Sequence, residues 1–301
     1  MKIGVVLVTY NRVSMLKKTL ELYEKQTKKP DYILVLNNHS TDSTEGLLTS
    51  WEETPSAIKH YVITTESNLG GSGGFNKALE YAQKLDAEWI WIADDDAYPT
   101  ENCIEELDRF AQTDIVKREN IVAICSKVLN EGKIDTGHRC RLGSKWIGNI
   151  DLPISENKYN MDYFFCDLFS YVGVAIEKST LKKAGLPRSD FFIYGDDYEH
   201  AIRVSKFGRI VCVPSIVINH DRGSSDTKEV SWRDYYETRN RLWICKNHSG
   251  IISFAIRIVL RRLTTLRSGS RLKLHIFNVA IEDAKNDRLG IHEEYKTGWT
   301  E

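Results

Sequence analysis

Three consecutive aspartates, Asp94, Asp95 and Asp96, are the residues of this 301-residue chain that point most directly to chemistry. They follow the apolar run 89–93 and precede Pro99, a pattern typical of a buried strand that ends in a turn. Three like charges this close are costly unless a cation neutralises them or some carboxyl groups stay protonated. A solvated acidic turn is the alternative, but ligands of open α/β sheets bind beyond strand carboxyl ends. The triplet therefore predicts a divalent-cation site.

Polar or glycine-rich stretches also follow the strands predicted before the triplet, at 3–9, 32–36 and 61–64. Helical patterns separate these strands, and such alternation predicts parallel βαβ units whose carboxyl ends share one sheet edge. We expect the glycines of 70–74 to form a loop before a helix N-terminus, where the backbone can approach an anion closely, and a flexible surface turn is the alternative. The candidate nucleotide-binding residues at this edge are Thr9, Tyr10, Asn11, Arg12, Asn37, Asn38, Gly70, Gly71 and Gly73.

Two further candidates lie in the less regular second half of the chain. Asp196 and Asp197 begin a helical pattern. They could interact favourably with the helix dipole, or one of them could act as a general base beside a metal. His220 ends a predicted strand. A histidine in such a place is more often structural, and it becomes a candidate metal ligand only if the fold brings it to Asp96.

The elements expected around these candidates are strands at 121–128, 210–213 and 216–220 and an extended stretch at 163–176. We expect 133–160 to be an irregular loop excursion over the site.

The last part of the sequence is helical in pattern, at 232–246 and again at 251–267. The second of these helices combines apolar residues with several arginines. A basic amphipathic helix indicates a membrane surface or a partner, including a second copy of the chain, and it can also pack on the main domain. The sequence leaves these alternatives open.

Composition limits the class of function. The net charge of −1 argues against wholesale nucleic-acid binding. The six cysteines are scattered without a CxxC pair, which argues against a zinc cluster or a disulfide framework and for a reducing compartment. No stretch reaches the roughly 18 apolar residues of a membrane span, and the apolar run 3–8 is too short for a signal sequence. We expect a cytoplasmic protein, with peripheral contact at the inner face of the cell membrane left open.

Five motifs occur in an order that belongs to a known family. They are VVLVTYNR at 5–12, LNNHSTDST at 36–44, ADDDAYP at 93–99, GDDYE at 195–199 and YYETRNR at 235–241. Through them the chain resembles inverting glycosyltransferases of family 2, which have the GT-A fold. NLGGSGGF, FFIYGDDYE and a later histidine make it most similar to bacterial galactofuranosyltransferases, with rhamnosyltransferases close behind. Gly195 departs from the galactofuranosyl pattern, which has a tryptophan there.

The resemblance implies an α/β fold, with a Rossmann-like, mostly parallel sheet flanked by helices and a C-terminal helical extension. Residues 1–230 would form the domain that binds the nucleotide sugar and performs catalysis. Residues 231–301 would form a helical region for acceptor, membrane-surface or oligomer contacts.

The resemblance also implies a role for individual residues. The metal ligands for Mn²⁺ or Mg²⁺ would be Asp94, Asp96 and His220, and the catalytic base would be Asp197. Donor and nucleotide contacts would come from Asp94 and Asp95 together with the sheet-edge candidates, of which Thr9, Asn11, Arg12 and Asn38 fall at uridine-diphosphate positions. Residues that orient the acceptor or the donor sugar would be Tyr194, Asp196 and Glu199.

The function expected from this resemblance is transfer of galactofuranose from UDP-galactofuranose to a hydroxyl of a growing, lipid-linked glycan of the cell surface. Rhamnosyl transfer from dTDP-rhamnose is the alternative among enzymes, and a non-catalytic glycan-binding or scaffold protein is the alternative of another class. A nucleotidyltransferase would normally carry a basic glycine-rich loop directly after its first strand, and this chain has TYNR at 9–12 instead.

Overall fold

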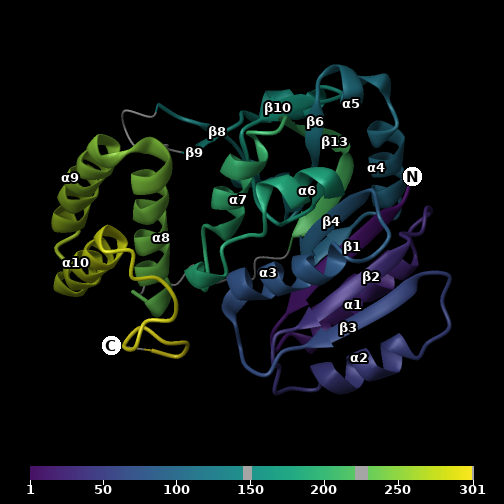
Figure 1. The fold of residues 1–301 in the computed structure, drawn as a ribbon, viewed down its shortest axis with the longest axis horizontal. Helices are drawn as coiled ribbons and strands as arrows, with labels where there is room; N and C mark the ends of the chain where they lie inside the picture. The colour runs from purple at the N-terminus through teal and green to yellow at the C-terminus, as the bar shows by residue number, and fades with distance from the viewer. Residues whose placement is uncertain (145–150, 221–229, 300–301) are drawn as a thin grey trace.

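The computed structural model describes residues 1–144, 151–220 and 230–299 (Figure 1). In this part of the chain a ten-stranded sheet forms the centre of the molecule, with the strand order β10-β13-β6-β12-β4-β1-β2-β3 and with β5 and β7 paired to β13 and β6. Its strands are β1 (Ile3–Thr9), β2 (Tyr32–Asn37), β3 (Lys59–Thr64), β4 (Trp89–Asp94), β5 (Ala97–Pro99), β6 (Ile121–Asn130), β7 (Lys133–Ile134), β10 (Phe164–Cys166), β12 (Val174–Glu177) and β13 (Arg209–His220).

The long strands of this sheet run mostly in one direction. β1 pairs in parallel with β2 and β4, β2 with β3, and β13 with β6, whereas β12 and β10 are antiparallel to their neighbours. A parallel sheet needs cover on both faces, and all seven residues of β1 are buried. Because successive side chains point to opposite faces, Val5 packs in one core with Leu16, and Val6 packs in the other with Phe75.

Helices cover both faces of the sheet, as Figure 1 shows. On the face of Val5 lie α1 (Val13–Glu24), α2 (Thr44–Glu52), α4 (Cys103–Ala111) and α5 (Asp114–Arg118). On the face of Val6 lie α3 (Gly70–Ala82), α6 (Lys178–Ala184) and α7 (Asp196–Val204). The predicted α/β fold, with a mostly parallel sheet flanked by helices, is confirmed.

The glycine-rich stretch is not the loop that its composition suggests. Helix α3 begins at Gly70 itself and runs through the remaining glycines. A Cβ atom on Gly74 would lie 2.7 Å from Cγ1 of Val8, and one on Gly70 would collide with the carbonyl oxygen of Phe192. Glycine therefore allows α3 to pack directly against β1 and against the chain that leads to α7. The prediction of a loop was wrong because these glycines serve close packing.

Two predictions for the second half also needed correction. The stretch expected to be irregular contains β8 (Arg139–Leu142) and β9 (Asp151–Pro153), which form a small antiparallel sheet with β11 (Leu168–Phe169). The two strands expected at 210–213 and 216–220 are one strand, β13, whose register with β6 shifts between Val213 and Val217. Pro214 lies at this shift, and proline in a strand is tolerated where the ladder is interrupted.

Three helices follow the sheet domain: α8 (Trp232–Ser249), α9 (Ile251–Arg267) and α10 (Arg271–Lys285), of which α10 was not predicted. A capping box between Ser231 and Asp234 begins α8, which satisfies free backbone N–H groups of its first turn. Leu242 and Trp243 of α8 belong to the same apolar core as α3. In Figure 1 the three helices form a layer beside the sheet domain, with α9 and α10 farthest from it.

The remaining short elements are η1 (Thr136–His138), η3 (Glu156–Asn160) and η4 (Ser189–Phe191). Among the helices that the structure describes, none is both long enough and apolar enough to cross a membrane.

Candidate active site

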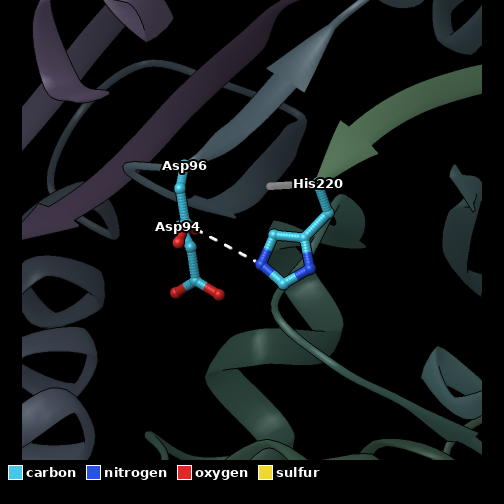
Figure 2. A group of neighbouring side chains, drawn as sticks. All are labelled: Asp94, Asp96 and His220. Atoms are coloured by element: carbon cyan, nitrogen blue, oxygen red, sulfur yellow. Dashed lines mark ion pairs between the residues drawn. The ribbon is translucent and has the colours of Figure 1, made fainter. Parts of the chain in front are cut away.

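The aspartate triplet divides into two environments at the carboxyl end of β4. One ligand atom each from Asp94, Asp96 and His220 lies within 4.8 Å of the others, and Figure 2 shows the two aspartates beside the imidazole ring, with a dashed line for the ion pair of His220 and Asp96. Asp95 instead accepts hydrogen bonds from Oγ1 of Thr9 at 2.6 Å and from Arg12 at 3.2 Å. The triplet is therefore not a uniform acidic turn, because the middle carboxylate is engaged by the end of β1.

Strand pairing brings His220 to the triplet from more than one hundred residues away in the sequence. The short strand β5 follows the triplet directly and pairs with the end of β13, so that His220 lies opposite Ala97. In this position Nε2 of His220 is 3.4 Å from Oδ1 of Asp96. The ring of His138, in η1, packs edge-on against the ring of His220 with centroids 5.3 Å apart. Sequence reasoning missed His138, because η1 lies in the stretch expected to be irregular.

Burial and mutual repulsion dominate the electrostatics of the triplet. Burial raises the pKa of Asp94 well above its ordinary value, and the charges of Asp96 and Asp95 raise it further. Burial also raises the pKa of Asp95 to about 6, although Arg12 and Thr9 oppose the rise. Burial disfavours ionisation of Asp96 as well, but its hydrogen bond with His220 and the charge of Arg12 outweigh that effect and lower its pKa.

The three converging groups fit a divalent cation. Two carboxylates and an imidazole are a donor set that suits Mn²⁺ and related ions. Nδ1 of His220 is buried and has no hydrogen-bond partner among the residues that the structure describes, whereas Nε2 faces Asp96. A cation would also relieve the repulsion that raises the pKa of Asp94. Asp94, Asp96 and His220 could therefore hold a metal ion.

A polar layer behind the triplet comes from Arg12, at the N-cap of α1, and from α1 itself. Arg12 donates to Oδ2 of Asp96 at 2.7 Å as well as to Asp95, and its side chain is 46% exposed. Oγ1 of Thr19 donates to the backbone carbonyl of Asp95 at 2.6 Å. Thr19 was missed because a threonine in a helical pattern gives no sign of such a contact.

Two of the predicted nucleotide-binding amides hold loops at the sheet edge. Oδ1 of Asn11 accepts a hydrogen bond from the backbone N–H of Thr41 at 2.7 Å. Oδ1 of Asn38 accepts one from the N–H of Leu69 at 2.9 Å, and its Nδ2 donates to the carbonyl of Gly70 at 3.0 Å. Their contact with a nucleotide stays a prediction, and these bonds give them a structural role as well.

The other sheet-edge candidates differ in their access to solvent. Tyr10 is exposed at the end of β1, and Asn37 is buried at the end of β2. The space beside Gly71 is open, whereas Gly73 is close to Leu69. Among the glycines considered, Gly71 therefore offers the least hindered approach to a ligand.

A strained turn leads into α7 and fixes where its carboxylates lie. The N–H of Ile193 donates to the carbonyl of Phe191 at 2.8 Å, and Phe192 between them has φ 65° and ψ −58°, which is a rare and strained γ-turn. After Ile193 the backbone has positive φ again at Tyr194, with φ 65°, and at Gly195, with φ 83°. Non-glycine residues with positive φ cluster at functional sites, where the surrounding structure holds them.

Side chains of α8 hold this turn. Nδ2 of Asn240 lies 3.1, 2.9 and 2.8 Å from the carbonyl oxygens of Phe191, Ile193 and Tyr194, so that its two N–H groups are shared among three acceptors. The buried Arg239 donates to the carbonyl of Phe191 at 3.1 Å. Both residues lie in the motif at 235–241, and sequence reasoning missed the contacts of Asn240. We call the two side chains together the α8 clamp.

The carboxylates of the first turn of α7 have different partners. Burial raises the pKa of Asp197, whose Oδ1 accepts a hydrogen bond from the N–H of Tyr198 at 2.7 Å. The charge of Asp197 also helps to raise the pKa of Asp94, so the two groups lie within electrostatic reach of each other. Burial, followed by the charge of Asp197, raises the pKa of Asp196 to about 7.

Glu199 is engaged in ion pairs in this structure. Nε of Arg203 lies 2.9 Å from each of its oxygens, and Nε2 of His248 lies 3.1 Å from Oε1. Burial disfavours its ionisation, but the hydrogen bonds from His248 and Arg203 lower its pKa to about 2. Tyr194 is 42% exposed beside the turn. Contact of Glu199, Asp196 or Tyr194 with a sugar stays a prediction.

The Asp196→Asn substitution is expected to stabilise the protein more at high pH than at low pH. The pKa of Asp196 in the folded protein, about 7, exceeds its ordinary value, so its contribution to stability is lost as the pH rises through that pKa, whereas asparagine stays neutral. The difference in Tm between the variant and the wild type should grow by about 3 °C or more between about pH 5 and about pH 8. Thermal scans by circular dichroism measure it.

Asp114→Asn is the matched control, because Asp114 also begins a helix but is exposed. It should give no pH-dependent difference in Tm. A difference for Asp196→Asn that is the same at both pH values would contradict the raised pKa of Asp196.

Comparisons with known proteins show the family and the fold of this chain. A family model described as "Glycosyl transferase family 2" matches residues 4–164. Galactofuranosyltransferase GlfT1 of Mycolicibacterium smegmatis is 27% identical over 211 residues, which cover 67% of this chain and 65% of that protein, so the match spans just under two thirds of the relative. GlfT1 of Mycobacterium tuberculosis is 28% identical over 233 residues, which cover 75% of this chain and 72% of that protein.

Two solved structures share the fold at low sequence identity. The mannosyltransferase PcManGT of Pyrobaculum calidifontis, solved with GDP-Man and Mn²⁺, has a TM-score of 0.58 and 15% identity over 95% of this chain and 75% of that one. S. aureus TarS 1–349, solved with UDP-GlcNAc, has a TM-score of 0.57 and 14% identity over 99% of this chain and 98% of that one. The GT-A fold is thereby confirmed. Because the family model spans more than half of the sequence, the chain belongs to glycosyl transferase family 2.

Proposed function

We propose that this chain transfers galactofuranose from UDP-galactofuranose to a hydroxyl of a glycan, with inversion at the anomeric carbon and with help from a divalent cation. The observation that carries the proposal is the convergence of Asp94, Asp96 and His220, with ligand atoms within 4.8 Å of one another, at the carboxyl edge of the sheet. Ligands of open α/β sheets bind at this edge.

Asp94, Asp96 and His220 would hold Mn²⁺ or Mg²⁺, and the ion would supply positive charge for the diphosphate that leaves the sugar. Arg12 pairs with Asp95 and Asp96, and nearly half of its side chain is exposed, so it can reach a phosphate oxygen. Asp95, held by Thr9 and Arg12, would face the ribose or the sugar.

Asp197 would act as the base. Burial raises its pKa, which makes its carboxylate a better proton acceptor than an exposed aspartate. It would take the proton of the acceptor hydroxyl while that oxygen forms a bond to the anomeric carbon and the bond to the diphosphate breaks. The electron pair of the broken bond leaves with the nucleoside diphosphate, and a single displacement of this kind inverts the anomeric configuration.

The choice of donor is supported by the relatives. The two GlfT1 proteins are named galactofuranosyltransferases. The O-antigen chain rhamnosyltransferase WbaN of Salmonella anatum is 22% identical over 107 residues, which cover 36% of this chain and 30% of that protein. Rhamnosyl transfer from dTDP-rhamnose is therefore the second candidate.

We further propose that the acceptor is a growing, lipid-linked glycan of the cell envelope, met at the inner face of the cell membrane. All six cysteines are buried free thiols, which fits a reducing compartment.

A panel of sugar nucleotides, incubated with the protein and Mn²⁺ and scored for release of the nucleoside diphosphate, tests the activity. Hydrolysis of UDP-galactofuranose that EDTA abolishes is the expected result. Preference for dTDP-rhamnose would favour the second candidate. Absence of turnover with every donor, in a protein that still binds a glycan, would favour a non-catalytic glycan-binding or scaffold protein.

A further inference from the structure

Helix α9 presents an apolar face to solvent. The large apolar side chains on it are between 43% and 67% exposed, and they are Ile251, Ile252, Val259, Leu260, Leu263 and Leu266. At 3.6 residues per turn, Ile252, Val259, Leu263 and Leu266 lie on one side of the helix. Phe254, on another side, is buried in the core that α8 shares with the sheet. We call the six exposed residues the α9 face.

The charge on this helix is of one sign. Its sequence, IISFAIRIVLRRLTTLR, contains four arginines and no acidic residue. By helical spacing Arg262 and Arg267 border, one on each side, the stripe of Ile252, Val259, Leu263 and Leu266, and Arg271 begins the next helix, α10. An exposed apolar stripe with cations along its borders is the pattern of helices that lie in the plane of a membrane surface.

The sheet domain does not cover the α9 face. Figure 1 shows α9 packed beside α8 and α10 in the helical layer, on the far side of α8 from the sheet. A second copy of the chain is a poor occupant, because a two-fold contact between identical α9 faces would set arginines against arginines with no carboxylate on either helix. Anionic lipid offers both complements, namely acyl chains for the apolar residues and phosphates for the arginines.

We propose that the α9 face binds the surface of a bilayer that contains anionic lipid, with α9 parallel to the membrane plane. Leu263 and Leu266 enter the boundary between headgroups and acyl chains, while Arg262 and Arg267 contact lipid phosphates. The binding surface is inferred from α9 alone. Only its purpose, which is to hold the active site near a lipid-linked acceptor, rests on the proposed function.

Flotation of the full chain with vesicles tests the proposal. The protein should float with phosphatidylcholine vesicles that contain phosphatidylserine and should stay behind with vesicles of phosphatidylcholine alone. Two double variants should each lower the floated fraction by about tenfold or more. One is Leu263→Gln with Leu266→Gln, and the other is Arg262→Gln with Arg267→Gln. Added salt should weaken flotation, because the arginine contribution is screened.

Matched controls separate this surface from general changes in hydrophobicity or charge. Ile291→Gln removes an apolar residue that is 56% exposed outside α9. Arg109→Gln with Arg118→Gln removes two exposed arginines from α4 and α5. Both control proteins should float as the wild type does, and circular dichroism should show all variants folded.

Equal flotation of the α9 variants and the controls would overturn the proposal, as would absence of flotation with anionic vesicles. Dimerisation in light scattering that the leucine substitutions abolish, without flotation, would assign the α9 face to a second copy instead. Hydrolysis of the sugar nucleotide in solution should not change in any of these variants. Absence of hydrolysis by the wild-type protein would therefore refute the proposed activity and would leave the proposed binding of α9 to lipid unaffected.

Discussion

Asparagine in place of Asp197 is expected to lower the rate of sugar transfer by about 10²–10⁴-fold, the usual contribution of a general base. The substitution keeps the shape of the side chain and its place in the first turn of α7, but it removes the group that would accept the proton of the acceptor hydroxyl. Binding of the donor and of Mn²⁺ should change little, since Asp197 is not one of the three converging ligands. Initial rates at saturating donor and acceptor measure the effect.

Two comparisons make this result specific. Asp114→Asn removes a first-turn carboxylate from α5 and should leave transfer unchanged. Asp196→Asn removes the neighbouring carboxylate and should cost less than Asp197→Asn if the base is correctly assigned. If the Asp197→Asn protein binds the donor normally and transfers the sugar at a near-normal rate, Asp197 is not the base.

Alanine in place of His220 is expected to weaken Mn²⁺ binding by at least about tenfold, since even the loss of a group that only supports a metal ligand typically has an effect of that size. The substitution leaves Asp94 and Asp96 without the imidazole that converges with them. Electron paramagnetic resonance of free Mn²⁺ measures the affinity without any turnover. Sugar-nucleotide hydrolysis should fall in parallel and should be partly restored by higher Mn²⁺ concentrations.

His275→Ala is the control for this experiment, because His275 is an exposed histidine on α10. It should bind Mn²⁺ as the wild type does. Chelation by EDTA should stop hydrolysis in the wild type, and added Mn²⁺ should restore it. Unchanged Mn²⁺ affinity in His220→Ala would exclude His220 as a ligand and would leave it as a hydrogen-bond partner of Asp96.

The sheet edge could be predicted from the sequence because it depends on local patterns. Apolar runs separated by helical spacing indicate parallel strands, and the residues that end such strands must share an edge. The triplet at 94–96 and the residues that follow β1 and β2 were found in this way. These residues lie at one edge of the sheet because their strands are parallel.

The contact between His220 and Asp96 could not be predicted from pattern. It depends on β5, a strand of three residues that pairs with the end of β13, and so short a strand leaves no periodicity to detect. The resemblance to a known family suggested a later histidine as a metal ligand, and the structure brings the two side chains to 3.4 Å.

The α8 clamp and the γ-turn were also beyond sequence reasoning. Phe192 and Tyr194 have positive φ, but neither residue type favours that conformation, so the sequence gives no signal for it. Asn240 lies in a helical pattern, where an asparagine is unremarkable. For the glycines of α3 the sequence did carry a signal, but a misleading one. Their composition suggests a loop, whereas their role depends on close contacts with Val8 and Phe192.

With Asp197 as the proposed base, the α8 clamp would make the active fraction of the protein depend on the local stability of its helical layer. Asn240 holds the turn that sets the position of Asp197, and a turn with strained backbone relaxes when its partners are lost. Local opening of α8 would therefore inactivate a molecule whose sheet is intact. Any ligand that stabilises the helical layer raises the competent population by mass action, so a lipid surface bound by α9 would act as an activator of the enzyme as well as its anchor.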